Sequence, residues 1–260
     1  KIRGPVLFRE ASLEAGLSVQ NCTIGGKCVL YGADVNGPLR FTDTECRSPL
    51  NLERIDVTDE ATLDRIYCRR SFRVTGATFH GSTTFGDAQF EGSAQFTTAT
   101  FKKEVEATAA RLADRCDFRR VTAVTVIFDN VSFEAATRFD DTEVTKASFT
   151  NSRFNVGGRF TGITAHNRLN LESIVIGGTL RLDDATIEHV TFERTEVHPD
   201  NQSYIVSLEQ STIESGRLEI QANSLYYSTS HATLGDITLY CNDEDFALFE
   251  GILVSNTTFS

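Results

Sequence analysis

Large apolar residues recur along this chain at intervals that alternate between five and six residues. Two columns become visible when the sequence is written in lines of eleven residues from Gly4. The fifth position holds Phe8, Val19, Leu30, Phe41, Leu52, Leu63, Val74, Phe85, Phe96, Ala107 and Phe118. The tenth position holds Leu13, Ile24, Val35, Cys46, Val57, Cys68, Phe79, Phe90, Phe101 and Leu112. Because only Ala107 is small, the pattern indicates an internal repeat, the feature that decides the whole fold.

The intervals fit neither the 3.6-residue period of a helix nor the plain alternation of a long strand. A smaller apolar residue often stands two positions before a large one, as Ala77 does before Phe79. Since strand side chains alternate between two faces, such a pair shares one face of a short extended segment. We therefore predict a corner every five or six residues, with one large side chain directed inward from each side. Several lines open with a glycine, where we expect a positive φ or a close backbone approach: Gly4, Gly26, Gly37, Gly81 and Gly92.

The pattern continues with small slips beyond Phe118. Its later members are Phe128, Phe133, Phe139, Val144, Phe149, Phe154, Phe160, Leu171, Ile176, Leu182, Ile187, Phe192 and Val197, with Ala123 and Ala165 as small members. Residues 198–203 interrupt it and are predicted to form a loop, after which Leu208, Ile213 and Leu218 resume it. From about Gln221 we expect the register to be lost. We therefore predict a repeat domain over residues 1–220 and an irregular C-terminal cap or oligomerisation segment over residues 221–260.

The segment from Ala77 to Phe101, ATFHGSTTFGDAQFEGSAQFTTATF, resembles the pentapeptide-repeat proteins in their variant with alternating five- and six-residue spacing. The resemblance covers residues 4 to about 213. It implies an all-β fold, a right-handed quadrilateral β-helix with four sides per coil and with Phe or Leu stacked inside. A coil then takes about 22 residues, and the array holds about ten coils. Residues 22 apart should stack, so we expect Phe96 on Phe118 and Phe79 between Val57 and Phe101.

Composition excludes several classes of protein. The hydrophobic fraction of 40% in 260 residues is too high for a disordered chain, and no apolar run reaches the length of a membrane-spanning helix. The 36 acidic against 25 basic residues give a net charge of −11, which argues against direct nucleic-acid binding through phosphate contacts. The 19 Phe fit a stacked interior. Since the sequence contains no Met, we expect Lys1 to be a processed or trimmed end.

The six cysteines do not form a metal-binding pattern. Cys22 and Cys28 lie six residues apart with no second pair nearby, so a zinc site is not expected. Cys46 and Cys68 lie 22 residues apart in one column, and stacking would place them within reach of a disulfide bond. We expect free interior thiols instead, because the other members of the column are apolar. Free thiols favour a cytoplasmic location and leave an extracellular one open.

Histidines and paired acidic residues show no catalytic spacing either. The histidines are His80, His166, His189, His198 and His231, and the acidic groups are Asp140–Asp141, Asp183–Asp184 and Asp243–Asp245. The two doublets follow inward residues, so we expect them at exposed corners and not across a bound sugar. The third group does not match a calcium-binding loop. We therefore predict no catalytic, cofactor-binding or metal-binding residue, and no cofactor.

Three functions remain as hypotheses. The first is a non-catalytic β-solenoid scaffold or protein–protein interaction module, alone or as part of a longer protein. The resemblance also implies a second, an acidic DNA mimic that binds a type II topoisomerase, and the third is a carbohydrate-active β-helix. One outward column reads Arg9, Tyr31, Glu53, Thr75, Thr97 and Arg119, and another reads Gly25, Arg47, Arg69 and Glu91. Because a phosphate mimic needs charges of one sign, these mixed columns favour the first hypothesis.

The expected partner is a protein, with no direct nucleic-acid binding and no membrane span. Outward Thr78 and Thr100 share a column with Asp34 and Asp56, so no flat threonine array is expected. An open solenoid end exposes unpaired backbone groups, and Pro5 removes one of the donors. We predict a monomer or a homodimer through the C-terminal segment, with the N-terminal end covered by sequence that precedes Lys1.

Overall fold

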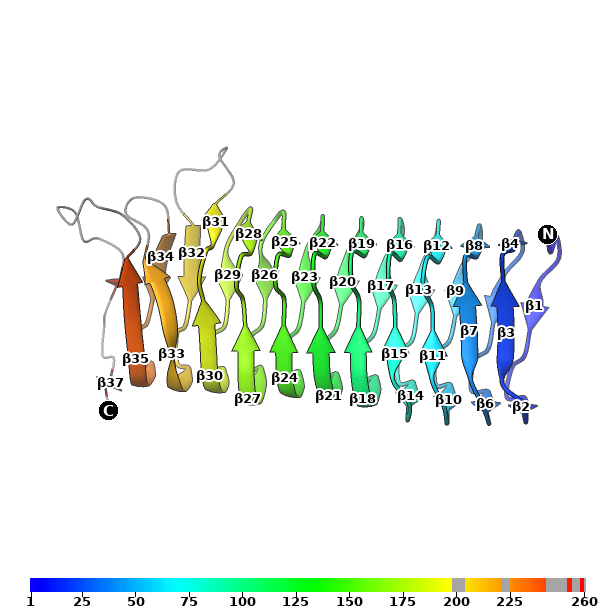
Figure 1. The fold of residues 1–260 in the computed structure, drawn as a ribbon, viewed down its shortest axis with the longest axis horizontal. Helices are drawn as coiled ribbons and strands as arrows, with labels where there is room; N and C mark the ends of the chain where they lie inside the picture. The colour runs from blue at the N-terminus through cyan, green and yellow to red at the C-terminus, as the bar shows by residue number, and fades with distance from the viewer. Residues whose placement is uncertain (198–203, 221–224, 242–251, 254–257, 260) are drawn as a thin grey trace.

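The computed structural model describes residues 1–197, 204–220, 225–241, 252–253 and 258–259. Over these residues the chain forms short parallel strands and no helix, and the strands stack into a rod of about ten coils (Figure 1). The predicted β-solenoid with about 22 residues per coil is therefore confirmed. No helix in these ranges could cross a membrane, as expected.

Each coil places strands on four sides of the rod. The first side carries β1 (Val6–Leu7), β5 (Cys28–Val29), β9 (Leu50–Asn51), β13 (Phe72–Arg73), β17 (Ala94–Gln95), β20 (Cys116–Asp117), β23 (Thr137–Arg138), β26 (Gly158–Arg159), β29 (Leu180–Arg181), β32 (Tyr204–Ser207), β34 (Leu225–Ser228) and β36 (Ile252–Leu253). The fourth side carries β4 (Thr23–Ile24), β8 (Glu45–Cys46), β12 (Tyr67–Cys68), β16 (Gln89–Phe90), β19 (Arg111–Leu112), β22 (Ser132–Phe133), β25 (Arg153–Phe154), β28 (Val175–Ile176) and β31 (Glu196–Val197).

The second and third sides are separate strands near the N-terminus and merge into long strands later (Figure 1). The second side begins with β2 (Ser12–Leu13), β6 (Asp34–Val35), β10 (Asp56–Val57) and β14 (Thr78–Phe79), and the third with β3 (Leu17–Gln20), β7 (Leu39–Thr42), β11 (Ala61–Thr62) and β15 (Thr83–Thr84). The merged strands are β18 (Thr100–Glu106), β21 (Thr122–Ile127), β24 (Glu143–Ser148), β27 (Thr164–Asn170), β30 (Thr186–Phe192), β33 (Thr212–Ile220) and β35 (Thr233–Cys241), followed by β37 (Thr258–Phe259). Strand β18 pairs with both β14 and β15, so the corner between these two sides becomes continuous strand there.

The coil length is not uniform along the rod. Val57 pairs with Phe79 and Phe79 with Phe101, which is the expected 22-residue register. Phe101 still pairs with Ala123 at 22 residues, but Glu104 pairs with Thr125, so one residue is lost between Ala123 and Thr125. Leu112 accordingly pairs with Phe133, 21 positions on. The slip therefore lies after Phe118, where the sequence pattern placed it. A surface corner tolerates such a change because the inward residues on both sides keep their stacking partners.

The stacking continues beyond Gln221, where the sequence pattern was expected to end. Strand β34 pairs with β32 and β35 with β33, so Val206 faces Tyr227 and Ile213 faces Leu234 at 21-residue spacing. Both Tyr227 and Leu234 are buried. The expectation of a lost register is therefore wrong over residues 225–241. Most of residues 242–260 lies outside the described residues, and the C-terminal cap stays a prediction.

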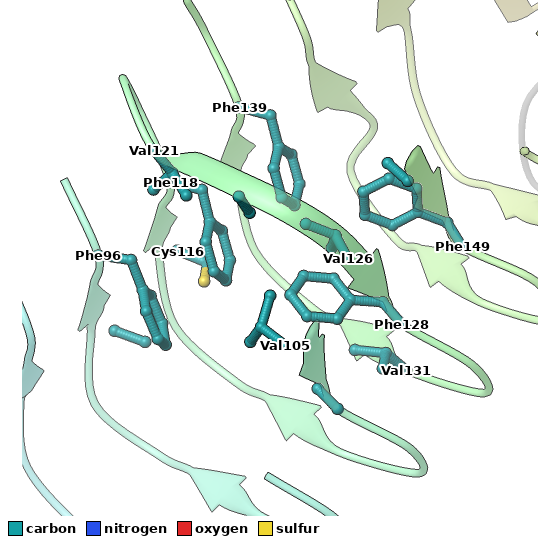
Figure 2. Close-up of a cluster of buried hydrophobic side chains, with 14 of the residues drawn as sticks. Phe96, Val105, Cys116, Phe118, Val121, Val126, Phe128, Val131, Phe139 and Phe149 are labelled. Carbon is teal, nitrogen blue, oxygen red and sulfur yellow. The ribbon is translucent and has the colours of Figure 1, made fainter. Parts of the chain in front are cut away.

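Stacked phenylalanines fill the interior (Figure 2). Phe96, Phe118, Phe139 and Phe160 form one ladder, with ring centroids 4.3, 4.7 and 4.7 Å apart. The predicted burial of Phe85, Phe90, Phe96 and Phe101 is confirmed, since each is at most 3% exposed. Ala107, a small member of the columns, lines an apolar cavity of about 10 Å³ among the rings.

Most described coils contain a residue with positive φ at two of their corners, and most of these residues are not glycine. Arg54 (φ 55°) follows Leu52, and its N–H donates to the carbonyl of Thr75 in the next coil at 3.0 Å. This hydrogen bond between coils stabilises a backbone conformation that most side chains disfavour. The glycine expectation holds at Gly81, where an added Cβ would lie 2.3 Å from the carbonyl oxygen of Asp59. It is wrong at Gly4, which has open space around it.

Candidate functional surface

Side chains fill the interior over the described residues, and the cavity near Ala107 is about one water molecule in size. Within the described ranges no three His, Cys, Asp or Glu side chains are grouped so that they could hold a metal ion. Any functional site among these residues must therefore be sought on the outer surface of the rod.

Ion pairs between neighbouring coils cover much of that surface. Arg65 donates to Asp43 at 2.6 Å across one coil, and Arg111 bridges Glu91 and Glu134 at 2.9 Å each. These pairs put both charges side by side, in agreement with the mixed outward columns of the sequence. Where the structure describes the outer surface, these pairs interrupt any continuous stripe of negative charge of the kind a DNA mimic requires.

A groove of about 430 Å³ runs along the corner between the fourth and first sides of the rod. Small residues line this corner, among them Ala136 and Gly157. At Gly157 (φ 86°) an added Cβ would lie 2.2 Å from the carbonyl oxygen of Thr179, so no larger residue fits. Val156 borders the groove and is 54% exposed. The corner thus combines a hollow floor with an apolar edge.

Arginines line the other edge of the groove. Arg138, Arg159 and Arg181 are register partners on β23, β26 and β29, so their side chains leave the same face one coil apart. Arg115 lies at the corner one coil earlier. We call these four residues the arginine ladder. Arg138, Arg159 and Arg181 lie 21 and 22 residues apart in the sequence, but neither of the two outward columns described above contains them.

Asp140 holds the middle of the arginine ladder in place. Arg138 donates to Oδ2 of Asp140 through both Nε and a terminal nitrogen, at 3.0 and 2.7 Å. Nε of Arg159 lies 3.0 Å from Oδ1 of the same carboxylate. The Asp140 side chain is only 7% exposed, so the expected exposed-corner position is wrong for this residue. It is buried because two guanidinium groups from adjacent coils cover it.

The structure also places most of the other acidic and histidine residues that the sequence pattern singled out. Asp141 and Asp184 are exposed corner residues, as expected, and Asp183 accepts a hydrogen bond from the Ser207 hydroxyl. Two histidines face a carboxylate of the preceding coil, His80 on Asp56 and His166 on Glu143. The ring of His189 lies 3.0 Å from the Ser215 hydroxyl, and His231 contacts Ser230. His198 and the run 243–245 lie outside the described residues.

Outward threonines form a longer column than the sequence suggested. Thr78, Thr100 and Thr122 are register partners, and after Glu143 the column continues with Thr164, Thr186, Thr212 and Thr233. It is a single row broken by a charged residue, so the expectation that no flat threonine array forms is confirmed for these strands. The change from 22- to 21-residue coils hid the later members from a fixed-period reading.

Cys46 and Cys68 stack as register partners in the interior and are free thiols. A hydrogen bond with Cys46, together with burial, raises the pKa of Cys68 well above its ordinary value. Burial raises the pKa of the Cys28 thiol to about 12. The thiols of Cys28 and Cys68 are therefore protonated at neutral pH and unsuited to nucleophilic or metal chemistry.

We expect these buried thiols to resist alkylation in the folded protein. With iodoacetamide at about pH 8, Cys28, Cys46 and Cys68 should stay unmodified while the half-buried Cys22 reacts, because only the exposed thiolate is reactive. Peptide mass spectrometry reads the sites, and the same reaction in guanidinium chloride is the control in which all of them react. Rapid modification of Cys46 in the folded protein would contradict this placement.

A second prediction concerns acid stability. Burial raises the pKa of Asp117, but the two-pronged hydrogen bond from Arg119 (2.8 and 2.6 Å) outweighs it and leaves that pKa below its ordinary value. A carboxylate with a lowered pKa stabilises the fold above its unfolded pKa of about 4, and the stabilisation is lost as the pH falls through the lower folded value. We expect Arg119→Gln to lower the free energy of unfolding by up to about 1 kcal/mol at pH 7.

Thermal unfolding at several pH values tests this expectation. The difference between wild type and Arg119→Gln should shrink below about pH 4 and vanish once Asp117 is protonated in both states. Arg120→Gln is the matched control, since Arg120 is an exposed neighbour. An Arg119→Gln effect that stays constant down to about pH 2 would show that the contribution is not the ion pair with Asp117.

Comparison with family models, with curated proteins and with solved structures returned no match to this chain. The structure itself is a parallel β-solenoid whose coil of about 22 residues is compatible with a pentapeptide-repeat fold. The groove beside the arginine ladder is the surface feature that departs most from the paired charges elsewhere on the rod.

Proposed function

We propose that this chain is a pentapeptide-repeat protein that serves as a non-catalytic scaffold and binds a protein partner along the side of its rod. The alternating spacing of five and six residues, the four sides per coil and the stacked Phe interior support the family assignment. The β-solenoid fold itself is consistent with a scaffold or an interaction module.

The observation that carries the proposal is the difference between the apolar interior of the rod and its polar outer surface. The large apolar side chains of each coil point inward, while the outer faces present backbone-supported rows of polar and charged side chains at a fixed spacing of one coil. Such a surface is rigid and extended, which suits recognition of another chain. The buried carboxylate of Asp140 is neutralised by two arginines, so it does not support the carbohydrate-active hypothesis, which needs two free carboxyl groups.

Site-specific photo-cross-linking in the native cell tests the proposal. A photoreactive amino acid is placed at one outward position per side of the same coil, at Thr78, Thr84, Gln89 or Gln95. We expect one or two neighbouring sides to capture a single protein and the opposite sides to capture none. Capture from no side, or a reducing-sugar screen that shows turnover by the purified protein, would overturn it.

A supercoil-relaxation assay tests the DNA-mimic hypothesis. Inhibition of supercoil relaxation by a type II topoisomerase would identify the captured partner class as that enzyme. The mixed charges of the outer columns speak against this outcome.

A further inference from the structure

We infer that the groove beside the arginine ladder binds an acidic, extended segment of a protein partner. The inference rests on the proposed function as an interaction module and assigns its binding site and the chemistry of its partner. It is carried by the charge, the shape and the spacing of the groove.

The first observation is an excess of positive charge in an acidic protein. Arg138 and Arg159 share the single carboxylate of Asp140, and among the described residues Arg115 and Arg181 form no ion pair. The groove therefore carries uncompensated cations on a chain whose net charge is −11. Guanidinium groups prefer planar anions such as carboxylates, which they bind through two parallel hydrogen bonds.

Two other hollows among the described residues differ in charge. One of about 320 Å³ places Arg40 and Lys103 next to Asp59 and Glu60, so its charges cancel. Another of about 390 Å³ contains the His166 and Glu143 pair. Charge complementarity to an acidic ligand is thus a property of the arginine-ladder groove and not of grooves on this rod in general.

Asp140 prepares the ladder for a ligand. Its carboxylate accepts two hydrogen bonds from Arg138 and forms an ion pair with Arg159, which holds both side chains in place. The other N–H groups of the two guanidinium groups remain available to a ligand. A ligand then meets cations that are already ordered, which lowers the entropic cost of binding. Asp140 is a positioning residue in this arrangement.

The dimensions fit a short extended segment. Adjacent coils lie about 4.8 Å apart, so the ladder from Arg115 to Arg181 spans about 14 Å, the length of four to five residues of extended chain. The floor at Gly157 and Ala136 admits a backbone, and the exposed side chain of Val156 offers apolar contact to residues between the acidic ones. A long polyanion fits less well, because the acidic remainder of the rod repels it.

Fluorescence anisotropy with a labelled hexaglutamate peptide tests the inference on the full chain. We expect binding at about 0.1 M salt that weakens strongly towards 1 M, where the screening length falls to about 3 Å. The double variant Arg115→Gln with Arg181→Gln should weaken binding by about three- to thirtyfold, since each exposed ion pair contributes a small increment. Neither arginine covers a buried carboxylate, so the variant should fold normally.

The matched control removes two arginines from the opposite corner of the rod. Arg40→Gln with Arg168→Gln changes the net charge equally and should leave hexaglutamate binding within about twofold. Equal weakening by both variants, no binding by wild type, or tighter binding of a six-nucleotide thymidine strand than of hexaglutamate would each overturn the inference. If the cross-linking experiment captures a partner on a side away from the groove, the scaffold function holds and the groove assignment fails.

Discussion

Replacement of Phe96 by alanine is expected to lower the free energy of unfolding by about 3–5 kcal/mol, the largest effect we predict for a single substitution. Its ring is 3% exposed and stacks on Phe118 at 4.3 Å, with edge contacts to Phe72 and Phe85 at 5.7 Å. A rigid ladder of rings cannot close the resulting gap, because each ring is fixed by the coils above and below. The lost contacts and the cavity therefore add to each other.

Guanidinium chloride denaturation measures this effect as a shift of the midpoint. Gln95→Ala is the matched control, since Gln95 precedes Phe96 on the same side but points outward, and it should change the free energy of unfolding by at most about 0.5 kcal/mol. An unchanged midpoint for Phe96→Ala would mean that the ring does not lie in the interior ladder.

The second large effect is expected from Gly81→Ala. An added Cβ at Gly81 would lie 2.3 Å from the carbonyl oxygen of Asp59 in the preceding coil, so one of the two backbones must move. Separating two coils strains the hydrogen bonds on both adjoining sides, and we expect a loss of about 1–3 kcal/mol or more in the free energy of unfolding.

Gly86→Ala provides the comparison in the same coil. Its nearest neighbour would be Oδ1 of Asp64 at 3.4 Å, an ordinary contact, and the backbone there needs no positive φ. This variant should be neutral or slightly more stable, because alanine reduces the freedom of the unfolded chain. Similar losses for both variants in thermal unfolding would show that general loss of glycine, and not the close approach at Gly81, is responsible.

The repeat in the sequence predicted the inward residues, and its resemblance to the pentapeptide-repeat proteins implied an all-β solenoid with a coil of about 22 residues, including the pairing of Phe79 with Phe101. The reason is that every coil solves the same packing problem, so one side chain per side must be large and apolar throughout. A change in coil length therefore shows in the sequence as a break in a column of inward residues. The slip after Phe118 is such a break, because the residue lost between Ala123 and Thr125 shortens that coil to 21 residues.

The tertiary structure decided what the columns do not encode. Asp140 reads as an exposed corner residue in the sequence, and it is buried only because arginines from its own and the next coil close over it. The arginine ladder likewise exists only once coils of 21 and 22 residues are stacked in register. Outward positions are free to vary from coil to coil, so their chemistry depends on which neighbours the stacking brings together. The sequence alone therefore determined the interior, and the stacking of the coils determined the surface.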